Sequence, residues 1–172
     1  KIKLDLKLVA DVGIIGYPSV GKSTLISVIS AAKPKIAAYH FTTLVPNLGV
    51  VHVSDRSFIV CDVPGLIEGA SRGAGLGLTF LRHVERTRLL IHLLDISEGP
   101  SRNPIDDFHG LNHELNAYHP SLNKKIQMVA LNKIDIPAVR ERAMEFGPRF
   151  ENMGYRLFLI SGKTGEGVEE LM

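Results

Sequence analysis

The sequence is poor in several features that mark particular classes of protein. It has a single cysteine, Cys61, so no disulfide can form within the chain, which agrees with a reducing cytoplasm. No apolar run is long enough to span a membrane, and the first residues lack the pattern of a signal peptide. A formal net charge of +2 is too small to indicate nucleic-acid binding by itself. These absences favour a soluble, cytoplasmic globular protein.

The length and composition suit one compact domain with a sizeable core. The chain has 172 residues, of which 45% are hydrophobic and 22% are charged. Its first residues, "KIKLDLKL", begin within an apparent strand, and its last, "GVEELM", stop within an apparent helix. We therefore expect residues 1–8 to be the tail of a preceding N-terminal domain or linker. Residues 9–172 are expected to form a domain that is truncated at its C-terminus.

Apolar, β-branched runs alternate with segments of helical period, which predicts an α/β fold with a sheet flanked by helices. Only "SDR" separates the second strand from the third, which predicts an antiparallel hairpin. The other connections are long enough for parallel crossovers, so the sheet should be mostly parallel. Strands are expected over residues 8–15, 49–53, 57–62, 89–95, 126–132 and 156–160. Helices are expected over residues 22–32, 76–86, 105–118 and 138–153, and from 168 onward.

The stretch "GYPSVGKST" at 16–24 follows the first apolar strand and leads into a helix. A GxxxxGKS loop can direct several backbone N–H groups at phosphate oxygens, and the following helix adds its positive N-terminal end. Lys22 would reach the β- and γ-phosphates, and the Ser23 hydroxyl would bind Mg²⁺. The alternative is a strand-to-helix turn with a chance lysine. The position between a strand and an amphipathic helix favours the phosphate loop.

A second motif, "VCDVPGLIEG", places Asp62 at the end of another apolar strand. A carboxylate there can hold Mg²⁺ through a water, while Gly65 offers an N–H to the γ-phosphate and Pro64 stiffens its approach. This DxxG pattern is weak alone and strong after a phosphate loop. The intervening "AAYHFTTLVPNLGV" contains two threonines, Thr42 and Thr43. One hydroxyl could complete the Mg²⁺ shell when a γ-phosphate is present; the alternative is a plain loop leading into an edge strand.

The segment "ALNKID" at 130–135 predicts which base is bound. The Asp135 carboxylate can accept hydrogen bonds from a ring N–H and an exocyclic amine of guanine, whereas adenine offers no such adjacent pair. Asn132 can bridge the base and the phosphate loop, and the stem of Lys133 can lie across the ring. Backbone N–H groups of "ISGKTG" at 160–165 could meet the guanine carbonyl oxygen. Alone, NKID could be a surface turn; in this order the motifs point to guanine.

Five loops in this order resemble the translation-factor-related GTPases, and "DVPGLIEGASRGAG" with "FTTLVPNLGVV" is similar to the Obg family of ribosome-associated G proteins. The resemblance implies a P-loop NTPase fold, a Ras-like G domain with a six-stranded, mostly parallel sheet. It implies GTP and GDP as substrate and product, with Mg²⁺ held by Ser23, Thr43 and Asp62. The candidate catalytic groups are Lys22, Thr43 and Gly65. The nucleotide contacts that it implies are Gly16, Tyr17, Pro18, Ser19, Val20, Gly21, Lys22, Ser23, Thr24, Phe41, Thr42, Thr43, Leu44, Val45, Asp62, Val63, Pro64, Gly65, Asn132, Lys133, Ile134, Asp135, Ser161, Gly162 and Lys163.

The resemblance also implies partners and a cellular role. Obg-family proteins act in maturation of the large ribosomal subunit and in growth or stress control, so the expected partner is that subunit with its ribosomal RNA. Guanosine tetraphosphate is a further expected ligand, and a monomer is expected. The chain departs from relatives at Gly162, where alanine is commoner, and at Ser19, where an asparagine in the wider class is linked to potassium-stimulated hydrolysis.

Leu66 follows the DxxG glycine, where Ras-like proteins have a glutamine that orients the attacking water. An aliphatic side chain cannot position water or accept a proton. We therefore expect slow intrinsic GTP hydrolysis that rises when the domain docks on a partner. One alternative is a hydrolysis-deficient guanine-nucleotide sensor, and another is an adenine-nucleotide phosphotransferase that uses the same phosphate loop.

Overall fold

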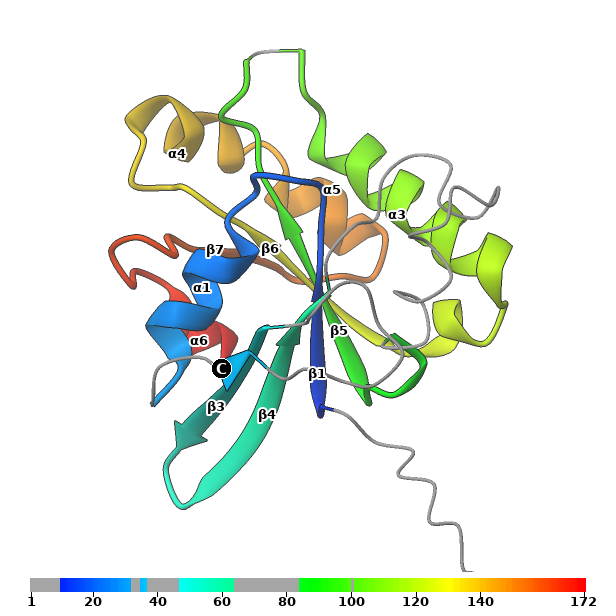
Figure 1. Ribbon diagram of the computed structural model, residues 1–172. Coiled ribbons are helices and arrows are strands. Elements are labelled where there is room, and N and C mark those ends of the chain that lie inside the picture. The colour runs from blue at the N-terminus through cyan, green and yellow to red at the C-terminus, as the bar shows by residue number, and fades with distance from the viewer. Residues whose placement is uncertain (1–9, 32–34, 37–46, 64–83, 100) are drawn as a thin grey trace, which may run out of the picture.

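One sheet with parallel strands at its centre organises the protein. The computed structural model describes residues 10–31, 35–36, 47–63, 84–99 and 101–172, to which all structural statements below refer. The sheet has seven strands in the order β2-β3-β4-β1-β5-β6-β7 (Figure 1). Their bounds are Val12–Ile15 for β1, Lys35–Ile36 for β2, Asn47–Val53 for β3, Arg56–Asp62 for β4, Leu89–Leu94 for β5, Ile126–Leu131 for β6 and Leu157–Leu159 for β7.

The predicted α/β fold is confirmed, and the six expected strands are all present. The parallel pairs in the sheet are β4–β1, β1–β5, β5–β6 and β6–β7. In contrast, β3 and β4 form the expected antiparallel hairpin. Val53 pairs with Arg56, so the turn itself is only Ser54 and Asp55, and Ser54 adopts the positive φ of 53° that such a tight turn needs. The two-residue strand β2 adds a seventh, antiparallel strand beside β3. It is too short to leave a sequence pattern.

Helices cover both faces of the sheet. In Figure 1, α1 and α6 lie on one side of the strands and α3 and α5 on the other, while α4 lies beyond the ends of the strands. The expected helix over 76–86 lies mostly outside the described residues, although Val84 at its end is buried. The bounds are Lys22–Ile29 for α1, Pro104–Tyr118 for α3, Pro137–Ala143 for α4, Gly147–Asn152 for α5 and Val168–Leu171 for α6, with a 3-10 turn at Leu122–Lys124.

Two of the expected helix boundaries are wrong, for identifiable reasons. The helix predicted over 138–153 is two helices, because Pro148 at the start of α5 has no N–H with which to continue a helix that came from α4. The helix predicted over 22–32 ends at Ile29, because the chain turns toward the sheet and the Ala31 N–H donates to the Val50 carbonyl of β3 at 2.9 Å. A long-range hydrogen bond thus replaces the last helical turn.

Alternating side chains along the strands build one hydrophobic core on each face. On the α1 and α6 side, Val12 and Ile14 of β1 pack with Leu25 and Ile26 of α1. On the other side, the strands pack against α3, α4 and α5, with Phe108 among the buried residues of α3. Burial on both faces is what the near-continuous apolar runs of the central strands predict. The core holds the strands in register, so their carboxyl ends, where the sequence motifs lie, meet at one edge.

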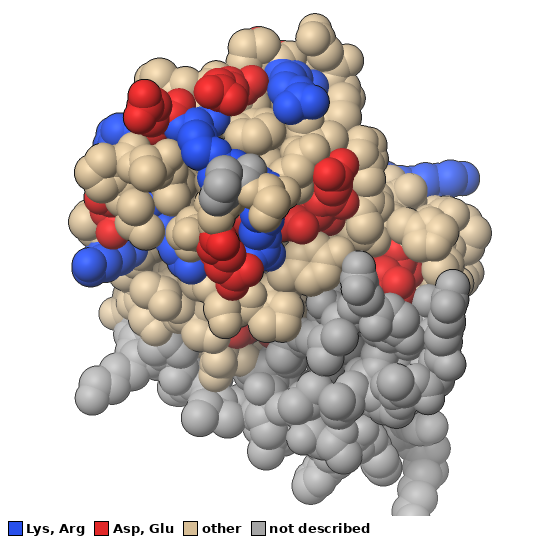
Figure 2. Space-filling model, turned by 90° about the horizontal axis from the view of Figure 1, so that it is seen from above, with Lys and Arg blue, Asp and Glu red and all other residues tan. Residues whose placement is uncertain are grey.

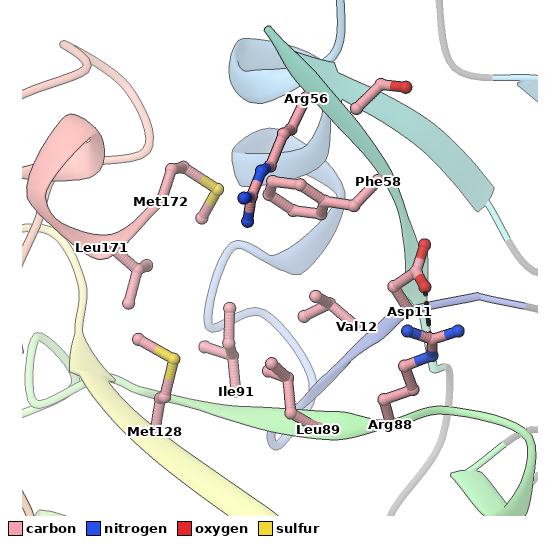
Figure 3. Close-up of a pocket in the computed structure, with 11 residues that line it drawn as sticks. Asp11, Val12, Arg56, Phe58, Arg88, Leu89, Ile91, Met128, Leu171 and Met172 are labelled. Atoms are coloured by element: carbon pink, nitrogen blue, oxygen red, sulfur yellow. Dashed lines mark ion pairs between the residues drawn. The ribbon is translucent and has the colours of Figure 1, made fainter. Parts of the chain in front are cut away.

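An apolar hollow of about 370 Å³ lies at the amino ends of the strands, where β1, β4 and β5 begin (Figure 3). Leu171, Met172, Val12 and other apolar side chains line it, and the Asp11–Arg88 ion pair at 3.5 Å lies at its rim. None of the sequence motifs reaches this hollow. Within the described part of the chain, no helix is both long enough and apolar enough to cross a membrane.

Candidate functional site

The loop between β1 and α1 has the backbone shape that its glycines predict. Gly21 adopts a φ of 98° directly before α1, and Ser19 adopts a φ of 64°. A Cβ added at Gly16 would lie 2.4 Å from the Leu93 carbonyl oxygen, and one added at Gly21 would lie 2.5 Å from the Asn132 amide nitrogen. Larger residues are thus excluded at both glycines, by close packing at Gly16 and also by backbone conformation at Gly21. The close approach brings the loop against the ends of β5 and β6.

Lys22 is folded over the same loop. Its Nζ donates to the Gly16 carbonyl at 2.9 Å and to the Tyr17 carbonyl at 3.0 Å. Burial lowers the pKa of Lys22, and the nearby Asp62 carboxylate opposes that change. The ammonium is therefore kept at the rim of a hollow of about 440 Å³ that is lined by the loop and the start of α1. A positive charge and the N-terminus of an eight-residue helix converge there, as an anion site requires.

Ser23 and Asp62 bring two hard oxygen donors to this hollow. The Ser23 hydroxyl donates to Oδ2 of Asp62 at 2.7 Å, and Oδ1 of Asp62 is buried without a hydrogen-bond partner among the described residues. An orphaned buried carboxylate oxygen beside a hydroxyl fits a small divalent cation. Among the described residues, no group of three or more His, Cys, Asp or Glu side chains could hold a metal ion. A cation here would therefore also need phosphate or water oxygens, which is the manner in which Mg²⁺ is usually bound.

Asn132 connects three of the loops. It lies directly after β6 and is 3% exposed. Its Nδ2 donates to the Val20 carbonyl of the phosphate loop at 2.8 Å, and its Oδ1 accepts from the Gly162 N–H at 2.8 Å. The expected link to the phosphate loop is present, and the link to Gly162 was not anticipated. Because both polar ends of the amide are used, the side chain acts as a fixed strut between the two halves of the site.

Asp135 and Lys163 face a second hollow, of about 330 Å³, that adjoins the first. Both hollows are lined by Gly21 and Thr24, so they are parts of one groove along the carboxyl edge of the sheet. Ser161 donates to Oδ1 of Asp135 at 2.8 Å, which orients the carboxylate, and Lys163 Nζ lies 4.0 Å from Oδ2. The sequence-predicted phosphate and base residues therefore meet in one continuous groove.

The backbone N–H groups of "ISGKTG", which we expect at the guanine carbonyl oxygen, have partners within the protein. The Gly162 N–H donates to Asn132, and the Thr164 N–H donates to the Ser161 hydroxyl at 3.1 Å. The Lys163 N–H has a longer bond to the same hydroxyl, at 3.3 Å. Of these three backbone N–H groups, that of Lys163 has the longest hydrogen bond, so it is the one best suited to donate to a base carbonyl. The loop therefore supports Asn132 through the Gly162 N–H and Asp135 through the Ser161 hydroxyl.

Lys133 has a partner that the sequence motifs do not include. Its Nζ lies 2.6 Å from Oδ2 of Asp95, which follows β5 directly and has no exposed side-chain surface. A signal was present in the sequence, because Asp95 ends a buried strand just as Asp62 does. Sequence reasoning did not use it, since no motif surrounds it.

The remaining predicted residues fall into three groups. Pro18, Ser19 and Thr24 line the phosphate side of the groove, whereas Val63 and Ile134 are 0% and 4% exposed. The side chains of these last two belong to the core, so any nucleotide contact from them would come from the backbone. The predictions that lie outside the described residues are those for Phe41, Thr42, Thr43, Leu44, Val45, Pro64 and Gly65.

Comparison with known proteins shows the family of this chain. The family model described as 50S ribosome-binding GTPase matches residues 11–133, which contain the phosphate loop, Asp62 and Asn132. The chain belongs to this GTPase family. Among its relatives, GTPase Obg of Ruminiclostridium cellulolyticum is 54% identical over 170 residues, which are 98% of this chain and 40% of that protein. GTPase Obg of Roseiflexus castenholzii is 55% identical over 172 residues, which are 100% of this chain and 39% of that protein.

The relatives confirm the predicted resemblance to Obg GTPases, and the chain spans about two fifths of their length. A solved structure, the G domain of the T. maritima FeoB iron transporter, aligns with a TM-score of 0.68 at 24% identity. That alignment covers 93% of this chain and 92% of the FeoB chain. At this identity the likeness concerns the fold alone. It supports the predicted P-loop G-domain architecture for this member of the GTPase family.

Proposed function

We propose that this domain binds GTP and GDP in the groove along the carboxyl edge of the sheet and hydrolyses GTP slowly, as a molecular switch. The observation that carries the proposal is the Asn132 strut. It joins the phosphate loop at Val20 to the loop of Gly162 beside the carboxylate of Asp135. This arrangement fixes the distance between the phosphate loop and the carboxylate of Asp135, which we expect to select guanine. A guanine nucleotide matches both ends at once.

Magnesium fits the phosphate end of the groove. Ser23 and Asp62 would hold it, with Thr43 as a further expected ligand, and the ion would neutralise charge on the β- and γ-phosphates. Ser23 and Asp62 already lie within hydrogen-bonding distance, so little rearrangement of either side chain is needed. Lys22, which lines the same hollow, contributes a second positive charge.

The guanine assignment is tested by Asp135→Asn. The amide keeps the shape and the contact with Ser161 but cannot accept two hydrogen bonds from guanine. Affinity for GDP should fall on the order of 10²-fold or more, the factor for two charge-assisted hydrogen bonds, and preference should shift toward xanthosine diphosphate. Titration calorimetry with GDP, XDP and ADP measures this. Equal binding of ADP and GDP by the unmodified protein would show that the guanine assignment is wrong.

Slow turnover follows from Leu66, which cannot orient water. We expect the isolated domain to release phosphate slowly, and large ribosomal subunits to accelerate it, since a group supplied in trans is worth roughly 10³ to 10⁵ in related enzymes. Rapid hydrolysis by the domain alone would contradict this reasoning. Because Leu66 replaces the glutamine that orients water, a guanine-nucleotide sensor that does not hydrolyse GTP is the second candidate. A single-turnover assay separates the two, because a sensor releases no phosphate even with the subunit present.

The proposed partner is the large ribosomal subunit, including its RNA, in the cytoplasm. The family name and the likeness to Obg GTPases support this. Figure 2 shows acidic and basic side chains intermixed on the described part of the face seen from above, so a uniformly basic surface is not what would bring RNA to that face. Co-sedimentation with large subunits, in GDP and in a non-hydrolysable GTP analogue, tests the partner. Competition by guanosine tetraphosphate for bound GDP tests the further ligand, and sedimentation velocity tests the expected monomer.

A further inference from the structure

A buried carboxylate outside all five sequence motifs stands behind the base end of the groove. Asp95 follows β5, and its side chain has no solvent exposure. Its Oδ1 accepts from the Ser97 N–H at 2.8 Å, and its Oδ2 accepts from the Ser97 hydroxyl at 3.0 Å and from Lys133 Nζ at 2.6 Å. A carboxylate removed from water in this way needs a close counter-charge. Lys133 supplies it across 38 residues of sequence.

The same lysine lines the base side of the groove. Lys133 adopts a φ of 68°, a left-handed conformation that non-glycine residues rarely use, and its side chain runs from the NKID loop to Asp95. The ammonium of Lys133 is fixed at Asp95 and Ser97. The part of this side chain that lines the hollow beside Asp135 is therefore its methylene stem. Lys163 lines the same hollow but differs, because its side chain is 82% exposed and its ammonium is 4.0 Å from Asp135.

The segment that contains Asp95 is itself held in place. Arg142, at the end of α4, donates to the carbonyl oxygens of Ile96, Gly99 and Arg102 at 3.1, 3.0 and 3.2 Å. Because α4 begins two residues after Asp135, the loop after β5 and the NKID loop are attached to the same helix. The position of Asp95 is thus set by protein contacts alone, before any nucleotide binds.

We propose that Asp95 is a positioning residue for purine binding, which acts by holding the Lys133 stem against the face of the base. The inference rests on the proposed nucleotide site. Asp95 does not touch the nucleotide. It holds Lys133 in place beforehand, so that nucleotide binding does not have to immobilise a flexible lysine side chain and lose its conformational entropy. Releasing that lysine should weaken binding about tenfold, the factor for ordering one rotamer-rich side chain. The stem contacts a ring face, so the effect should be the same for any purine.

The first experiment is Asp95→Asn in the otherwise intact protein, with competition against a fluorescent GDP derivative. Affinity for GDP and for inosine diphosphate should fall by the same factor of about ten, while inhibition by magnesium pyrophosphate, which occupies only the phosphate end, should not change. A general loss of structure would weaken all three. Unchanged GDP affinity, or an equal loss for pyrophosphate, would overturn the proposal.

A matched control is Asp11→Asn, at the opposite edge of the sheet. Asp11 is also an ion-paired aspartate, 3.5 Å from Arg88, and its Oδ2 accepts from the Ile59 N–H at 3.0 Å. This variant should leave the affinities for GDP and inosine diphosphate as they are. If Asp11→Asn also lowered the affinity for GDP tenfold, any substitution of this kind would disturb the groove. The proposed positioning role of Asp95 would then be wrong.

A double-mutant cycle with Lys133→Met shows whether Asp95 acts through Lys133. Methionine keeps an unbranched stem without the ammonium, so adding Asp95→Asn to it should cause no further loss of GDP affinity. An additional tenfold loss would overturn the proposal. Lys133→Met alone leaves a buried, unpaired carboxylate and can impair folding; the double variant removes both charges, so its affinity can be compared directly with that of Asp95→Asn.

These outcomes are separate from failure of the proposed function. If the unmodified protein binds ADP as well as GDP, the guanine assignment fails while the Asp95 effect on purine nucleotides in general can still be measured. If the unmodified protein selects guanine and Asp95→Asn leaves GDP affinity unchanged, the function stands and the positioning role is wrong.

Discussion

Lowering the pH should destabilise this protein through one buried histidine. His92 lies on β5 with no solvent exposure, packed against Phe108 of α3 with ring centroids 4.7 Å apart. Both of its ring nitrogens are without a hydrogen-bond partner among the described residues. Burial lowers the pKa of His92 to about 3, and the nearby Gln127 side chain opposes that change only in part. The folded state therefore keeps this imidazole neutral well below the pH at which a free histidine is protonated.

The sign and size of the effect follow from linkage. The unfolded chain takes up a proton near the ordinary pKa of 6.5, so the contribution of His92 to stability is intact above that pH and is lost progressively as the pH falls from 6.5 toward 3. Between pH 7.5 and pH 5.0 the loss should be about 2 kcal/mol, at about 1.4 kcal/mol per pH unit below 6.5. For a domain of this size that is a large fraction of the net stability.

Urea unfolding at both pH values, in the unmodified protein and in His92→Leu, measures this contribution. Leucine has a similar volume and does not titrate, so the difference in unfolding free energy between the two proteins should shift by about 2 kcal/mol from pH 7.5 to pH 5.0. Contributions from all other groups cancel in that difference. His52→Asn, on the exposed part of β3, is the control variant measured in the same way. If the difference between the unmodified protein and His92→Leu is independent of pH, the buried-neutral assignment is refuted.

Three glycines give further predictions. Gly162→Ala should raise the unfolding free energy by about 0.5 kcal/mol and change GDP affinity less than twofold. The reason is that the new Cβ would lie at an ordinary contact distance of 3.5 Å from its nearest neighbours. A loss of stability in thermal unfolding would contradict this. Gly16→Ala should cost about 2 kcal/mol by the same assay, since its Cβ would lie 2.4 Å from the Leu93 carbonyl. Gly110→Ala should weaken GDP binding, because its Cβ would lie 2.7 Å from the Tyr17 hydroxyl, and Tyr17→Phe in the same chain should restore it. Failure of that rescue in a binding titration would show that the contact does not act on the phosphate loop.

Much of the fold could be predicted because its signals are local. The hairpin of β3 and β4 follows from a connection too short for any crossover, and the parallel strands follow from apolar runs separated by helix-length segments. The two boundary errors have different origins. The break before α5 was readable from Pro148, which cannot continue a helix. The early end of α1 was not readable, because it depends on a hydrogen bond from Ala31 to Val50 in a strand on another part of the chain.

The sequence by itself determined the chemistry of each motif, because the phosphate-loop, DxxG and NKID motifs each carry their donors and acceptors within a few consecutive residues. Only the tertiary structure decided how these groups are held. Asn132 reaches Val20 across 112 residues, and Lys133 reaches Asp95 across 38. The physical reason is that such contacts depend on strand order and on which residues share the carboxyl edge of the sheet. Neither is written in any single segment of the chain.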